Sequence, residues 1–205
     1  MMLPTHVLGG MLLAAPLARV APELAPIGFV AGFLGGLFPD LDMYVGHRKT
    51  LHFPVYYSVF AAIALIAALA LPAAATVGAA LFLLGAAVHS VADMYGGGLE
   101  LRPWEGNSDR AVYDHYRGTW VAPRRLVRYD GALEDLALSV GLSIPLLYLV
   151  SGPLQQIVIG TLVVAAAYTM TRRHLAELAA QVVPYAPAAL SPFLPDRYLD
   201  DDPKQ

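Results

Sequence analysis

The chain has 205 residues, of which 57% are hydrophobic and only 14% are charged, a composition typical of a membrane protein. The net charge of −3 gives no indication of nucleic-acid binding, and no nucleic-acid partner is expected. The absence of cysteine excludes disulfides, iron–sulfur clusters and thiolate zinc sites, so imidazole and carboxylate must hold any metal ion.

Six apolar stretches follow one another at roughly 7–18, 25–38, 55–71, 73–88, 136–150 and 153–170. They form three closely spaced pairs with Pro or Gly in the turns, which predicts an all-α, polytopic membrane bundle of three helical hairpins. Between four and six helices are expected to cross the bilayer. The first two stretches are shorter than the ~20 residues that a span needs, so they can be short or re-entrant helices.

Glycine recurs every four residues in the second stretch, at Gly28, Gly32 and Gly36. This spacing would let another helix approach closely, although glycine as filler explains it equally well. We expect residues 1–183 to form one membrane-embedded helical domain with a polar insertion at about 94–131. A Pro- and Asp-rich tail with little fixed structure is expected at 184–205.

The basic residues fall almost entirely on one side of the predicted bundle. If each pair is a hairpin, segments 1–6, 39–54, 89–135 and 171–205 share one face and carry twelve of the thirteen Lys and Arg residues, leaving only Arg19 opposite. The positive-inside rule then places both termini and the large insertion on the cytoplasmic face of the cell's inner membrane. The insertion either caps a site or is an interfacial loop anchored by Trp104, Trp120 and arginines.

The stretch PDLD follows the second apolar segment, where Pro39 is expected to end the helix and leave Asp40 and Asp42 on a turn. Two carboxylates so close together repel each other unless a cation compensates them. His47, Arg48 and His52 follow within ten residues of Asp42. Imidazole with carboxylate is the ligand set expected for zinc, manganese or iron in a protein without cysteine.

The second group of candidates is His89 and Asp93, whose i, i+4 spacing places both side chains on one helix face. One ion could touch both, while the simpler alternative is a hydrogen-bonded pair at a helix end. His6 returns to the same face by the hairpin count and is a further candidate ligand. The first apolar run lacks the basic start of a secretory signal, so we expect it to stay in the mature protein.

Four more polar residues are expected to play no part in metal binding. His174 is interpreted as a surface residue, and His115, beside Asp114 in the polar insertion, is not expected to be a ligand. Glu134 and Asp135 are expected in the first turn of the fifth helix, where the helix dipole favours acids.

Four motifs occur in order along the first half of the chain: THVLGG, GLFPDLD, GHRKTLH and VHSVADMYGGG. They resemble those of the YdjM-type (DUF457) predicted membrane-bound metal-dependent hydrolases, in which an N-terminal His, PDxD, GHRxxTH and HxxxD follow one another. The resemblance covers residues 1 to about 105 and departs at residues 51–53, where the usual THS reads LHF. It implies an activity class but says little about substrate.

A more distant similarity is to the all-helical zinc-dependent phospholipase C and single-strand nuclease group. That group also uses a helix-borne HxxxD, an upstream Asp and His, and an N-terminal His. Its ligands for a third zinc have no clear counterpart here, which favours one or two metal ions.

These observations lead to a functional hypothesis of metal-assisted hydrolysis. Asp40 or Asp42 would hold a divalent ion with three further ligands, and His6 with a bridging carboxylate would serve a second ion. The three further ligands are His52, His89 and Asp93. Zinc is expected, with manganese or iron as alternatives.

The catalytic residues are expected to be Arg48 and His47. Arg48 could pair with a phosphate or interact with the two aspartates, and His47 could ligate the ion or donate from behind a ligand. The expected substrate is a small-molecule or lipid phosphoester, preferably in a membrane lipid, since the site opens at headgroup depth. The alternative is a non-catalytic membrane protein that binds a metal as a carrier or regulator. The sequence does not predict an oligomeric state.

Overall fold

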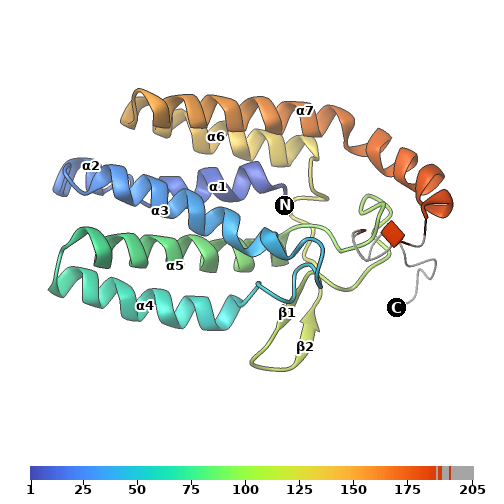
Figure 1. The fold of residues 1–205 in the computed structure, drawn as a ribbon, viewed down its shortest axis with the longest axis horizontal. Coiled ribbons are helices and arrows are strands. Elements are labelled where there is room, and N and C mark those ends of the chain that lie inside the picture. Colours follow the sequence, from blue (N-terminus) through green and yellow to red (C-terminus); the bar gives the residue numbers. More distant parts are fainter. Residues whose placement is uncertain (188, 191–193, 195–205) are drawn as a thin grey trace.

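The computed structural model describes residues 1–187, 189, 190 and 194, and most of the expected tail at 184–205 lies outside this part. The described chain is mostly helical, as predicted. Its long helices form three antiparallel pairs that lie side by side (Figure 1). α1 (Leu3–Leu12) and α3 (Ala25–Leu37) form the middle pair, and the short α2 (Leu17–Val20) lies between them in sequence.

The outer pairs are α4 (Pro54–Ala70) with α5 (Ala74–Ala92), and α6 (Leu133–Leu149) with α7 (Pro153–Val182). Proline stands at the start of both α4 and α7, where its missing N–H breaks no helical bond. Within the described residues, three helical segments are long and apolar enough to cross a membrane: Leu3–Val20, Ala74–Tyr95 and Pro153–Tyr185. α4 is apolar but shorter.

Close helix packing in the middle of the bundle depends on glycine. A Cβ added at Gly32 would overlap the carbonyl oxygen of Gly10 on α1, and one added at Gly36 would lie 2.5 Å from the His6 carbonyl oxygen. The prediction of a glycine-mediated helix contact is therefore confirmed. This contact holds α1, with His6, directly against the end of α3.

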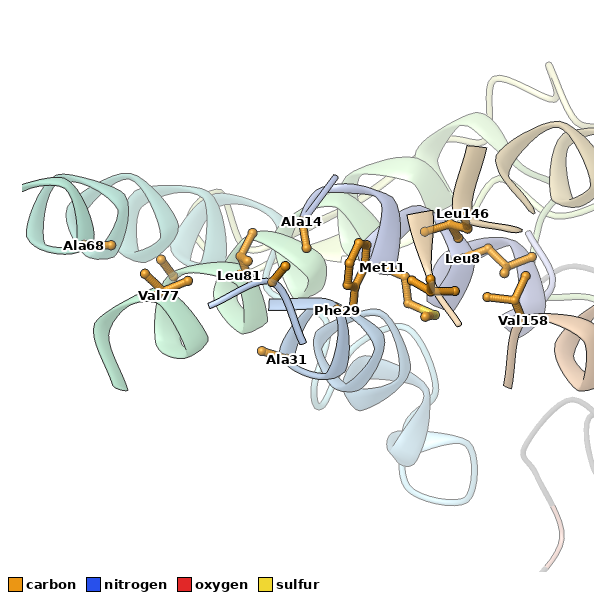
Figure 2. Packing of buried hydrophobic residues seen from close by; sticks show 13 residues of the cluster. Leu8, Met11, Ala14, Phe29, Ala31, Ala68, Val77, Leu81, Leu146 and Val158 are labelled. Atoms are coloured by element: carbon orange, nitrogen blue, oxygen red, sulfur yellow. The ribbon is translucent and has the colours of Figure 1, made fainter. Parts of the chain in front are cut away.

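The apolar core joins all three pairs. Figure 2 shows Leu8 and Met11 of α1 packed with Leu146 of α6 and Val158 of α7, all fully buried. Further along, Phe29 and Leu81 connect α3 to α5. Because this core is continuous, the ends of the pairs are held in a fixed relation to one another.

The connections at one end of the bundle contain short regular elements. A 3₁₀ turn, η1 (Phe38–Asp42), follows α3 directly, so Pro39 ends the α-helix as predicted. A second 3₁₀ turn, η2 (Asp93–Tyr95), continues α5, and η3 (Val183–Tyr185) follows α7.

The polar insertion contains an antiparallel hairpin of β1 (Val112–Asp114) and β2 (Thr119–Val121), paired at Val112–Val121. The predicted all-α fold did not include this hairpin. Each strand has only three residues, too few for a recognisable period-2 pattern.

Candidate metal centre

Four candidate ligands meet where α3, α4 and α5 come together. Asp40 lies on η1, His52 just before α4, His89 in the last turn of α5 and Asp93 at the start of η2. One ligand atom from each residue lies within 4.8 Å of the other three. The fold therefore brings Asp40 and His52 together with His89 and Asp93, as the ordered motifs led us to expect.

The spacing of these atoms matches a coordination site better than a hydrogen-bonded cluster. The Nε2 atom of His52 lies 3.6 Å from Asp40 Oδ1 and 3.3 Å from Asp93 Oδ2. The corresponding distances from His89 Nε2 are 3.3 and 3.6 Å. Ligands about 2.0–2.1 Å from a tetrahedral zinc ion would be ~3.3–3.4 Å apart.

Three of the four converging atoms are buried without a hydrogen-bond partner among the described residues: His52 Nε2, His89 Nε2 and Asp93 Oδ2. Buried polar atoms left unpaired are costly, and several at one point indicate a missing ion or water. The donor set of two imidazoles and two carboxylates suits a divalent transition metal. The residues present therefore fit a metal ion.

The other nitrogen of each histidine fixes the direction of its ring. His52 Nδ1 donates to Asp42 Oδ2 at 3.0 Å, and His89 Nδ1 donates to the Gly36 carbonyl oxygen at 2.6 Å. With the proton held on Nδ1, the lone pair of Nε2 faces the common point. Outer partners of this kind, a carboxylate and a backbone carbonyl, are usual behind metal-binding histidines.

Asp42 stands behind the centre and does not belong to the group of four. Its Oδ1 accepts from His47 Nδ1 and the Arg48 N–H, and its Oδ2 accepts from the Leu51 N–H and His52 Nδ1. Burial would raise the pKa of Asp42, but the hydrogen bonds from His47, His52 and the backbone hold it below the usual range. The arrangement resolves the choice between the two PDLD carboxylates: Asp40 faces the centre and Asp42 orients His52.

Asp40 is the most accessible member of the group, with a side chain 12% exposed against 0–1% for the other three. Burial would raise the pKa of Asp40, but the nearby His89 and His47 hold it below the usual range. The carboxylate is thus ionised and able to ligate at neutral pH.

Asp93 presents its second oxygen to the opposite side. Its Oδ1 lies 3.1 Å from His6 Nε2, 2.8 Å from the Met1 amine and 3.4 Å from an Arg48 nitrogen. The His6 ring also stacks on His89, with centroids 3.7 Å apart. His6 therefore borders the centre and supports both Asp93 and His89, but it is not among the four converging ligands.

Arg48 is a buried cation that links the centre to the insertion. One guanidinium nitrogen donates to the Gly97 carbonyl oxygen at 2.8 Å and, more weakly, to that of Ala111 at 3.4 Å. Burial would lower the pKa of Arg48, but Asp93 and other carboxylates raise it. Its backbone is left-handed, with φ of 59°, an uncommon conformation for a non-glycine residue and one associated with functional sites.

His47 lies between the centre and solvent. Its Nδ1 is 3.0 Å from Asp42 Oδ1 and 4.0 Å from Asp40 Oδ1. Burial lowers the pKa of His47 further than the two aspartates raise it, so the neutral ring carries its proton on Nδ1. No hydrogen bond among the described residues engages its Nε2, which leaves this atom available to a ligand.

A cavity of about 600 Å³ borders the centre at Asp40, His47 and Arg48. It continues along α7, and residues of α1 and α3 form the facing wall. The insertion contributes Gly98 and Leu99 to its rim. The insertion is therefore in contact with the site, while Trp104 packs under Arg173 of α7, with 5.3 Å between the guanidinium carbon and the ring centroid.

His115 and His174, which were not expected to be ligands, both lie outside the centre. His115 donates through Nε2 to the Lys49 carbonyl oxygen at 2.6 Å, and its ring packs on Phe53. His174 is exposed on α7.

Asp135 is more than a favourable charge at a helix start. It is fully buried, and its Oδ2 accepts from the Met2 N–H at 2.7 Å and the Gly131 N–H at 3.2 Å, while Thr5 donates to Oδ1. This carboxylate fixes the beginning of α1, next to His6. This role could not be predicted, because an acid in a first turn is already explained by the helix dipole.

No family model, no curated protein and no solved structure matches the chain.

Proposed function

We propose that the protein is a membrane-bound, metal-dependent hydrolase that cleaves phosphoesters at the centre formed by Asp40, His52, His89 and Asp93. The observation that carries this proposal is the set of unpaired, buried ligand atoms next to Asp40, which lines a cavity large enough for a substrate. A catalytic metal site requires ligand atoms, a position for water and access for the substrate, and the cavity at Asp40 supplies that access.

Zinc is the preferred ion, with manganese or iron as alternatives. The four nitrogen–oxygen distances of 3.3–3.6 Å and the mixed nitrogen and oxygen donors support zinc. One ion is favoured over two, because the far oxygen of Asp93 is already engaged by His6, Arg48 and the Met1 amine. A second ion at His6 would have to displace these partners.

A divalent ion in this centre would act as a Lewis acid and lower the pKa of a bound water from 15.7 toward about 7. Around it, Asp42 and the Gly36 carbonyl hold His52 and His89 in the required tautomer. Arg48 keeps Asp93 in place and contributes positive charge where a phosphate would lie.

His47 is the proposed proton carrier. The oxygen of water bonds to phosphorus as the ester P–O bond breaks. His47 Nε2 takes one water proton and returns it to the leaving alkoxide, and the other water proton stays with the phosphate. Asp42, bonded to His47 Nδ1, stabilises the ring while it carries both protons.

The inner membrane is the proposed location, with several spans and with the centre and both termini facing the cytoplasm. The three long apolar segments support a membrane location, and the distribution of basic residues supports this orientation. Membership of the YdjM-type family is part of the same proposal, supported by the four ordered motifs.

The rival function, a metal-binding protein without catalysis, is less well supported. A structural zinc site is closed because four protein ligands fill its coordination, whereas a catalytic site leaves a position for water. Catalysis at this centre therefore requires that water replace Asp40 or add as a fifth ligand. Here Asp40 is partly exposed and lines the cavity together with His47.

The test uses the purified full-length protein in detergent. Metal content is measured by elemental analysis, and a panel of phosphomonoesters and phosphodiesters, soluble and lipid, is screened with wild type and Asp40→Asn. We expect bound zinc and turnover in the wild type, with both lost in Asp40→Asn. Exposed Asp109→Asn serves as the matched control. Stable metal binding without turnover of any substrate in the panel would favour the non-catalytic alternative.

A further inference from the structure

The cavity beside the metal centre is much longer than a phosphate group needs. From α7 it is lined at positions 157, 160, 161, 164, 168, 172 and 175. These positions recur every three or four residues and therefore form one face of the helix. From Ile157 to Arg172 this face extends about 22 Å along the helix axis.

The facing wall is apolar as well. Val7 on α1 and Phe33 and Leu37 on α3 lie across from α7. Gly160 leaves room between the walls: no described atom lies within 4 Å of a Cβ built on it. A volume of about 600 Å³ is within the ~300–1,000 Å³ range of cavities that bind small ligands.

Polarity changes along the cavity in one direction. Ile157 and Val164 lie at its apolar end and are 40% and 58% exposed, so this end opens sideways where lipid chains would surround the protein. At the other end lie Asp40, His47 and Arg48, beside Arg172, whose Nε is 2.9 Å from Asp130. An apolar channel that leads to a charged end fits an amphipathic molecule.

From these features we infer that the cavity binds a phosphate-bearing membrane lipid, with one hydrocarbon chain lying between α3 and α7 and the phosphate at Asp40, His47 and Arg48. This inference rests on the proposed function for the identification of that lipid as the substrate. A small soluble phosphoester would leave the apolar walls uncovered, whereas a lipid chain buries them. The lipid would enter from the bilayer without leaving it.

Two glycines provide a matched pair of variants. Gly160 lines the cavity, while Gly141 on α6 does not, and a Cβ at either position meets no described atom within 4 Å. Gly160→Phe should therefore fill the cavity, and Gly141→Phe should place the same ring at the lipid-facing surface.

The primary measurement is binding of a lysophosphatidic acid with a pyrene-labelled chain to the full-length protein in detergent. We expect Gly160→Phe to weaken binding at least tenfold and Gly141→Phe to bind as wild type does. Unchanged metal content in both variants shows that the centre is intact. Equal binding by Gly160→Phe and wild type would overturn the inference.

A second measurement compares a phosphomonoester that carries a long hydrocarbon chain with one that carries none. Gly160→Phe should raise the KM for oleoyl lysophosphatidic acid at least tenfold more than it raises the KM for p-nitrophenyl phosphate, and Gly141→Phe should change neither. A loss of both activities to the same extent would count against a chain site. A third outcome separates the two proposals. If neither wild type nor the variants hydrolyse any phosphoester, but Gly160→Phe still weakens binding of the labelled lipid, the cavity assignment stands and the hydrolase function fails.

Discussion

Asp42 accepts the Nδ1 proton of His52 at 3.0 Å and thereby directs the opposite nitrogen of that ring to the metal centre. The same carboxylate also bonds His47 through its other oxygen. One residue thus controls a ligand and the proposed proton carrier, which makes it the most informative position for a substitution that leaves the four ligands unchanged.

Asp42→Asn should weaken metal binding by about 10–100-fold, the usual effect of removing a partner behind a metal-binding histidine. The amide brings N–H donors to a place where four donors already converge. The affinity is measured by titrating the metal-free protein with zinc. Exposed Asp109→Asn should bind like wild type, and an equal affinity for Asp42→Asn would show that His52 needs no orienting partner.

Removal of the metal should lower the thermal stability of the protein. An ion that binds only the folded state stabilises it by about 2.7 kcal/mol at a concentration 100 times its Kd. A chelator should therefore lower the unfolding temperature of wild type in detergent. Asp40→Asn, which lacks a ligand, should show no such response, and a matching shift in this variant would place the ion elsewhere.

Asp135→Ala should destabilise the fold by about 1–3 kcal/mol, because it leaves the buried N–H groups of Met2 and Gly131 without their acceptor. Thermal unfolding is the measurement. Glu134→Gln, at the neighbouring position, removes an ion pair with Arg128 that is largely exposed, and should have a smaller effect. If the two variants were equally stable, the anchoring role assigned to Asp135 would be wrong.

Gly32→Ala should cost about 1–3 kcal/mol, because the added methyl overlaps the Gly10 carbonyl and forces α1 and α3 apart. The same substitution at Gly141 meets no described neighbour and should stabilise its helix by about 0.5–1 kcal/mol. The unfolding temperatures of the two variants should therefore move in opposite directions. A shift of the same sign in both would mean that α1 and α3 do not require this contact.

Much of the helical arrangement could be predicted because apolar length and turn residues are local properties of the chain. The three pairs, the end of α3 before Pro39 and the close approach at Gly32 all follow from such patterns. The β-hairpin of the insertion could not be predicted, since its three-residue strands are stabilised by neighbours such as Arg48, whose carbonyl accepts the Tyr113 N–H.

The candidate ligands could be found from residue type, but not their individual positions. Asp40 and Asp42 are two residues apart, and only the 3₁₀ turn determines which carboxylate faces His89 and which faces His52 Nδ1. The anchoring role of Asp135 could not be predicted because its partners at the start of α1 are 130 and 133 residues away in sequence. Long-range contacts of this kind leave no local pattern.

The four ligand atoms come from segments between residues 40 and 93, and the centre is supported by α1 at its back. During synthesis, no portion of the chain shorter than the first four long helices can assemble it. If the protein is the membrane-bound metalloprotein proposed above, an ion can be captured only after α5 has been synthesised and has packed against α3 and α4.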